Sequence, residues 1–121
     1  MSDAMDCPVD WVRFRDLAVG EEGLRDIVMF YLAYAAEQLE AMRAAIAGGS
    51  VETVERLAHA TAGSSATAGA TALVPALLQL EQLAHAGCLD GAADLVDQAA
   101  AAFERVRECL GDELGPLDVT G

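Results

Sequence analysis

Apolar residues recur at steps of three and four along four long stretches of this chain, which is the period of one face of an α-helix. In the longest stretch, Leu24, Val28 and Tyr31 begin a stripe that continues to Ile46. The chain also contains 25 alanines among its 121 residues, and alanine is the best helix former and gives a core of small side chains. The pattern predicts an all-α fold and argues against a β-sandwich or barrel.

The predicted architecture is an antiparallel four-helix bundle, because four amphipathic helices joined by short loops bury their apolar stripes by packing together. We expect helices at 21–47, 50–68, 72–86 and 90–110, a short capping helix at 9–18 and a loose tail at 112–121. Ser50 and Thr71 are the expected N-caps of the second and third long helices, and Gly87 is the expected stop of the third. The length favours one domain, residues 1–121.

The charge balance excludes some classes of partner. Seven arginines and no lysine stand against 20 acidic residues, which gives a formal net charge of −13. Nucleic acids and anionic membrane surfaces attract clusters of basic residues, so neither is an expected partner. The longest apolar run covers only 27–36, whereas a membrane-spanning helix needs about 20 residues. The first residues show no signal-peptide pattern, so we expect a cytoplasmic protein.

The cysteines and glycines show no cofactor or metal motif. Cys7, Cys88 and Cys109 are odd in number and far apart, which is typical of reduced thiols in a cytoplasmic protein. The chain has no CxxC pair, no GxGxxG and no GxxxxGK[ST]. We therefore expect neither a bound metal nor a cofactor.

His59 is the first candidate for chemistry. It shares a helix face with Glu55, Arg56, Ala62 and Gly63, and this face of small or charged residues is expected to face solvent. A glycine inside a helix costs roughly 1 kcal/mol relative to alanine. In a chain so rich in alanine, Gly63 indicates that a large partner must approach His59, whose exposed imidazole would be the nucleophile.

The run 59–70, HATAGSSATAGA, resembles the signature of histidine-containing phosphotransfer (HPt) domains, the intermediate carriers of multistep two-component phosphorelays. The residues that match the family pattern are His59, Gly63, Ser64, Ser65, Gly69 and Ala70. The stretches 31–46 and 77–87 also look like helices of the family. The resemblance implies that His59 accepts a phosphoryl group from a receiver-domain aspartate and passes it to another receiver. It implies a phosphocarrier without stand-alone catalysis, whose Mg²⁺ is supplied by the receiver.

The resemblance also implies roles for two side chains near His59. Glu81 occupies the position whose side chain hydrogen-bonds the phosphorylatable imidazole, and the alternative is a solvated helix residue. The family's basic residue, three positions after the histidine, is replaced here by Ala62. Arg56, one turn before His59, is the nearest substitute for neutralising the phosphoryl group, and the alternative is an ordinary surface arginine paired with an acid.

Receiver domains dock on the family through an apolar surface beside the histidine. The expected partner-binding residues are Phe30, Tyr34, Ala62, Ala66, Val74 and Leu78. Phe30 and Tyr34 lie one turn apart, off the main stripe of their helix, and could instead cover the helix 9–18. Receiver domains are the expected partners, with a hybrid histidine kinase as a further candidate. We expect a monomer, since one chain closes its own bundle.

Other interpretations remain open at this point. The loss of the basic residue at position 62 is also compatible with an HPt-like adaptor that binds and titrates receivers without carrying phosphate. The dimerisation domain of a sensor kinase would have an acidic residue after the histidine, where this chain has Ala60. A helical mutase would need several buried basic residues. His85 lies four residues after Glu81, where the dipole at the helix end favours a partly protonated imidazole. We prefer this structural role for His85 to a catalytic role or to a metal pair with His59.

Overall fold

The structure, a computed structural model, describes residues 20–114, with side chains described for residues 23–111. The helices are α3 (Gly20–Ala47), α4 (Val51–Ala68), α5 (Val74–His85) and α6 (Ala92–Leu114), with a short 3₁₀-helix, η1 (Thr71–Leu73), before α5. Within these residues there is no strand, so the predicted all-α class is confirmed. The expected capping helix 9–18 lies outside the described residues.

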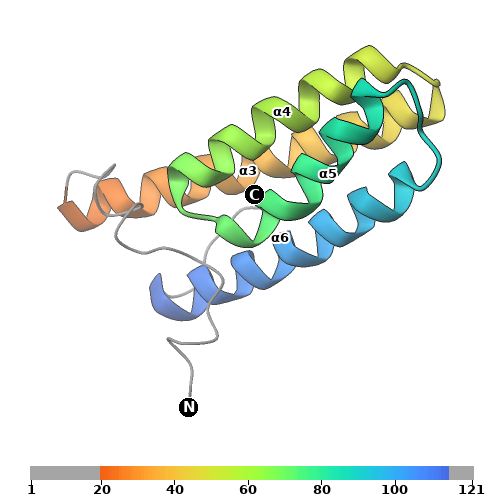
Figure 1. Ribbon diagram of the computed structural model, residues 1–121. Coiled ribbons are helices and arrows are strands. Elements are labelled where there is room, and N and C mark those ends of the chain that lie inside the picture. Colours follow the sequence, from red (N-terminus) through yellow and green to blue (C-terminus); the bar gives the residue numbers. More distant parts are fainter. Residues whose placement is uncertain (1–19, 115–121) are drawn as a thin grey trace.

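The four helices form an antiparallel bundle in which each packs against two others (Figure 1). Helix α3 contacts α4 and α6, and α5 contacts the same two helices from the other side. The short connections between successive helices make neighbours along the chain antiparallel. The predicted bundle is confirmed, and it brings α4, which carries His59, alongside α5, which carries Glu81.

The core is built from the predicted stripes. Val28 on α3, Ala58 on α4 and Leu77 on α5 are completely buried. The remaining completely buried apolar residues are Ala35, Met42, Val54, Ala70, Leu73, Leu80, Ala92, Val96, Ala99, Val106 and Leu110. The alanines of this set allow neighbouring helices to approach closely, so the core is compact although it contains few aromatic side chains.

Two left-handed glycines determine where the helices next to the site end. Gly69 has φ +102° and its amide donates a hydrogen bond to the carbonyl of Ser65, 3.0 Å away, which closes the last turn of α4. Gly87 has φ +81° and follows the last residues of α5, as expected for the predicted stop. Glycine adopts this conformation without the penalty that a Cβ atom would bring.

The predicted N-cap of α4 is confirmed, whereas the start of α5 and the end of α6 differ from the predictions. Ser50 is the N-cap of α4, but its hydroxyl bonds to Thr53 Oγ1 at 2.8 Å and makes no capping bond to the backbone. Thr71 is not the cap of α5, because η1 intervenes and Leu73 holds that position. Helix α6 continues past Gly111 into the segment expected to be loose, since one glycine weakens a helix without ending it.

The cysteines differ from the expectation of reduced thiols. Cys109 is disulfide-bonded and Cys88 is a free thiol, so the three cysteines are not all reduced; Cys7 lies outside the described residues. Spacing along the chain did not reveal this, because disulfides join residues that are close in the fold.

No helix in the part of the chain that is described is long and apolar enough to cross a membrane.

Candidate functional site

His59 projects from the middle of α4 towards solvent and is held there by Glu81 of α5. The Nδ1 atom of His59 lies 2.9 Å from Oε2 of Glu81. The imidazole is 76 % exposed, while the Glu81 side chain is 25 % exposed. A carboxylate accepts a hydrogen bond and does not donate one, so this contact places the ring proton on Nδ1 and leaves the lone pair of Nε2 for reaction.

A second pair of the same kind lies beside the first. Glu55, one turn before His59 on α4, places its Oε2 atom 2.8 Å from Nδ1 of His85, which follows Glu81 by one turn on α5. His85 stands in the last turn of α5, as the sequence predicted. Its partner, Glu55, was not predicted from the sequence, although the equal spacing of Glu and His on two antiparallel helices is a signal that could have revealed it.

Arg56 lies beside the first pair and beside Glu55 of the second. It lines a shallow groove together with Glu52, Glu55, His59 and Glu81, and it forms no ion pair with any other residue in the described range. The alternative expectation, an arginine paired with a neighbouring acid, therefore does not describe this side chain. Its guanidinium is exposed and is available to an anion at His59.

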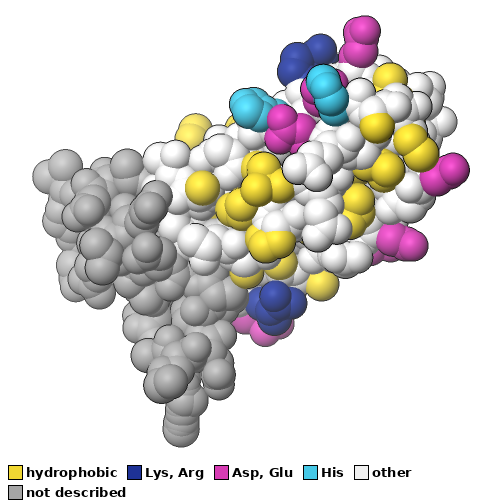
Figure 2. All heavy atoms as spheres, viewed as in Figure 1, with side chains coloured by type: hydrophobic (Ala, Val, Ile, Leu, Met, Phe, Trp, Pro, Cys, Tyr) yellow, Lys and Arg dark blue, Asp and Glu magenta, His cyan; other side chains and the backbone are white. Residues whose placement is uncertain are grey.

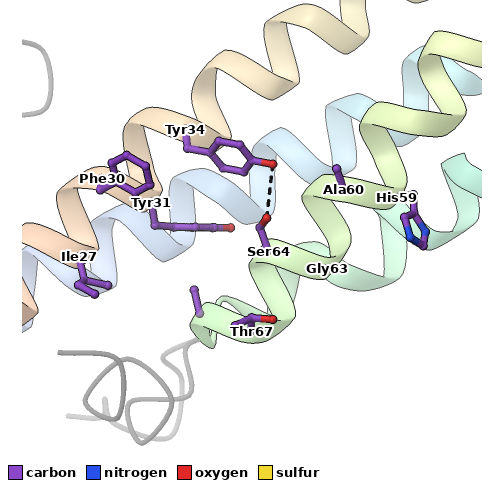
Figure 3. A pocket seen from close by; sticks show the side chains of 10 residues that line it. Ile27, Phe30, Tyr31, Tyr34, His59, Ala60, Gly63, Ser64 and Thr67 are labelled. Carbon is purple, nitrogen blue, oxygen red and sulfur yellow. Dashed lines mark hydrogen bonds between the residues drawn. The ribbon is translucent and has the colours of Figure 1, made fainter.

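An open apolar groove, 650 Å³ in volume, leads from His59 along the junction of α3 and α4 (Figure 3). Its walls are Ile27, Phe30, Tyr31 and Tyr34 from α3, and His59, Ala60, Gly63, Ser64, Thr67 and Ala68 from α4. Phe30 is 76 % exposed, which is unusual for a phenylalanine. A Cβ atom added at Gly63 would meet nothing within 4 Å, so packing inside the chain does not require this glycine.

Two tyrosine–serine hydrogen bonds connect α3 to α4 along the groove. The Tyr31 and Ser65 hydroxyls are 2.6 Å apart and buried, and the Ser64 hydroxyl donates to Tyr34 Oη at 3.4 Å. Burial raises the pKa of Tyr31 to about 12, opposed by the hydrogen bond from Ser65. The two serines that match the family signature therefore fix α4, and with it His59, against α3.

The other expected partner-binding residues are not all part of this surface. Ala62 is only 4 % exposed, which corrects the expectation that it shares the solvent face of His59, because its Cβ points into the contact between helices. Ala66 and Val74 are partly buried and Leu78 is 45 % exposed. Val74 and Leu78 do not line the groove that contains Phe30 and Tyr34.

No group of three or more histidine, cysteine or acidic side chains in the described range is arranged to hold a metal ion. The chemistry that this arrangement offers is that of an exposed imidazole nucleophile with an acidic hydrogen-bond partner, a nearby arginine and an adjoining apolar groove.

Comparison with known proteins agrees with this arrangement. The family model described as the Hpt domain matches residues 26–109. The chain belongs to the HPt domain family. Among solved structures, the HPt domain described here is similar to the crystal structure of histidine-containing phosphotransfer protein B (HptB) from Pseudomonas aeruginosa PAO1. The two share 25 % sequence identity with a TM-score of 0.82, and the match covers 90 % of this chain and 96 % of HptB. No curated protein matches the sequence.

The family and the structural similarity support histidine phosphotransfer in a two-component phosphorelay as the general role of this HPt domain. They confirm the resemblance found in the run 59–70. The receiver domains and histidine kinases with which HPt domains interact are accordingly the class of partner that the family implies.

Proposed function

We propose that this HPt domain accepts a phosphoryl group on Nε2 of His59 from the phospho-aspartate of one receiver domain and passes it to the aspartate of another. The observation that carries the proposal is the contact between His59 Nδ1 and Glu81 Oε2 at 2.9 Å. It orients an exposed ring with one nitrogen occupied and the other free.

The transfer needs little from this chain beyond position and charge. The Nε2 lone pair attacks phosphorus in line, the N–P bond forms, and the P–O bond to the receiver aspartate breaks with its electron pair leaving on the carboxylate. The proton on Nδ1 stays in place, and Glu81 faces the positive charge that the ring gains. Return to a second receiver is the same exchange in reverse. The receiver supplies the Mg²⁺, so the proposal requires no cofactor of this chain and no stand-alone catalytic activity.

Arg56 takes the place of the basic residue that the family carries where this chain has Ala62. It lines the same shallow groove as His59 and has no acidic partner among the described residues. A guanidinium matches the geometry of phosphoryl oxygens and can bind two of them. In this proposal, Arg56 neutralises part of the charge on phospho-His59.

The apolar groove is the docking surface for the receiver in this proposal. Phe30 supplies a large exposed aromatic contact, and Tyr34, Gly63 and Thr67 leave an open wall next to His59. Ala66, Val74 and Leu78 extend the contact as the rim of the interface. Association that rests on apolar area is compatible with a net charge of −13, because it does not depend on long-range attraction.

The proposal includes a cytoplasmic monomer. Each helix of the bundle already packs on two neighbours within the chain, so no second copy is needed to cover the core. Structural disulfides are rare in the cytosol, so the disulfide at Cys109 gives a check on the compartment. Protein isolated from cells with free thiols blocked at lysis shows which state Cys109 has there: a reduced thiol would fit a cytoplasmic location, and an intact disulfide would contradict it.

The experiment that tests the proposal is phosphotransfer from labelled receiver domains to the wild-type protein and to His59→Gln. We expect label that is labile in acid and stable in alkali on the wild type and none transferred from receivers to the variant. Binding of the receiver to both proteins is measured in parallel, because the exposed His59 side chain contributes little to the fold. Failure of every receiver to label the wild type would contradict the proposal.

A second candidate function is an adaptor that binds receivers without carrying phosphate. The observation that favours it is the absence of the family's basic residue, since Ala62 is both apolar and buried. Receivers that bind the wild type with the same affinity as His59→Gln, and transfer no label, would establish the adaptor.

A further inference from the structure

The second histidine of the chain stands in nearly the same environment as the first. His85 Nδ1 lies 2.8 Å from Glu55, and His59 Nδ1 lies 2.9 Å from Glu81. The two imidazoles are 78 % and 76 % exposed. Figure 2 shows both histidines on one face of the molecule, next to acidic side chains and close to an arginine.

This similarity follows from a repeated spacing on two antiparallel helices. Glu55 precedes His59 by one helical turn on α4, and Glu81 precedes His85 by one turn on α5. Each helix therefore contributes one imidazole and one carboxylate. Each Glu–His pair joins α4 to α5, and the two pairs lie about 6 Å apart along the helix axis. Both carboxylates bind the same ring atom, Nδ1, so both rings keep Nε2 free.

We propose that His85 is a second phosphoacceptor, a modification site distinct from His59; the proposal rests on the proposed function of this surface in phosphoryl transfer. The donor is a phosphoryl compound with a good leaving group, either the acyl phosphate of a receiver or a small phosphoramidate. The Nε2 lone pair of His85 attacks phosphorus, and the bond from phosphorus to the aspartate oxygen or to the ammonia nitrogen breaks. The leaving group takes the electron pair, and the Nδ1 proton stays between the ring and Glu55.

The surroundings of His85 leave this nitrogen accessible. Ala86 and Gly87 follow it at the end of α5, and both are exposed with little or no side chain. Arg56 lines a groove with Glu55, which places a cation beside the carboxylate of the second pair. His85 does not line the apolar groove that contains Phe30. A receiver docked in that groove therefore reaches His59, and His85 is expected to react best with small donors.

The test uses His59→Gln, in which the first acceptor is absent, with phosphoramidate in one arm and a labelled receiver in the other. We expect one phosphoryl group on His85 from phosphoramidate, located by mass spectrometry, and none on the double variant with His85→Gln. Adding Glu55→Ala to His59→Gln should slow this labelling about fivefold, the effect of one hydrogen bond. Glu40→Ala, which removes an exposed carboxylate of α3, is the matched control and should not slow it.

The outcomes separate this inference from the proposed function. Label in the phosphoramidate arm alone is the expected result and restricts the donors to small molecules. Label on His59→Gln in the receiver arm would identify receivers as a donor to His85 and would contradict exclusive transfer from receivers to His59. An unlabelled His59→Gln, under conditions that label the wild type, would overturn the second acceptor and leave His59 as the carrier. Labelling that is indifferent to Glu55→Ala would also overturn it, because His85 would then react like any exposed histidine. A wild type labelled by neither donor would overturn both.

Discussion

Glu81 of α5 holds Nδ1 of His59 of α4 at 2.9 Å across the contact between two antiparallel helices. The carboxylate is mostly shielded while the imidazole is mostly exposed, so the bundle fixes one edge of the ring and presents the other to a partner. The relationship explains how this surface of the bundle offers an oriented nucleophile.

The first prediction concerns this contact. Glu81→Ala removes both the hydrogen bond and the charge that faces the phosphorylated ring, and we expect the rate of transfer to His59 to fall about tenfold. Glu81→Gln keeps an acceptor for Nδ1 and should lose less. Rapid-quench measurements of transfer from a labelled receiver give the three rates. Equal rates for all three proteins would show that Glu81 does not orient the ring.

The second prediction concerns Arg56. Because this side chain is exposed, its attraction for a phosphoryl group is screened by solvent. We expect Arg56→Ala to slow transfer to His59 by about two- to fivefold and Arg56→Lys to have a smaller effect. High salt should reduce the difference between the wild type and Arg56→Ala. Arg105→Ala is the matched control, since Arg105 is exposed on α6, a helix that does not contact α4. An equal fall in the rate of transfer in Arg56→Ala and Arg105→Ala would contradict the role of Arg56.

The third prediction concerns Gly63. A small side chain at this position should stabilise the fold, and a large one should weaken the binding of receivers. A Cβ atom at this position meets nothing within 4 Å, so Gly63→Ala should raise the free energy of unfolding by about 1 kcal/mol through helix propensity. Gly63→Leu fills the groove beside His59 and should weaken receiver binding. Urea denaturation and binding titrations measure the two effects. Tight receiver binding by Gly63→Leu would show that the partner does not approach over this residue.

The fourth prediction concerns Tyr31 and alkaline pH. Burial raises the pKa of this phenol to about 12 from its ordinary value of 10.0, so the folded state retains its proton when the unfolded state loses it. The contribution of this group to the free energy of unfolding is fully present below pH 10. It is lost as the pH rises towards 12, which lowers the free energy of unfolding by about 2 to 3 kcal/mol.

Tyr31→Phe tests this dependence, because it removes the titrating group and the bond to Ser65. Urea midpoints measured from pH 9 to pH 12 should decline steeply for the wild type and less for the variant. The chain contains no lysine, so few other groups titrate in this window. Parallel declines for the two proteins would contradict the assignment to Tyr31.

Much of the fold could be predicted because the period of the apolar residues is a local property of the chain. Val28, Ala58 and Leu77 stand in the predicted stripes and are completely buried. The start of α5 was less predictable, since Thr71 is a good capping residue that lies instead in the 3₁₀-turn η1. The continuation of α6 past Gly111 is a case in which a neighbouring helical context outweighs one unfavourable residue.

The site was predictable only in part, because contacts across helices depend on register. His59 and Glu81 could be paired from the family resemblance. The His85–Glu55 pair emerges only when the register that His59 and Glu81 set is extended by one turn along each helix, and this step was not taken. The burial of Ala62 was missed for a related reason. A residue three positions after His59 lies 60° around the helix from it, and the neighbouring helix decides whether that direction is open.

The most direct test of the account is to identify the nitrogen of His59 that carries the phosphoryl group after transfer from a receiver. Phosphorus–proton correlation by NMR on protein labelled at histidine distinguishes the two ring positions. The account predicts phosphorylation at Nε2, because Glu81 occupies Nδ1. A phosphoryl group on Nδ1, or no phosphoryl group on His59, would contradict it.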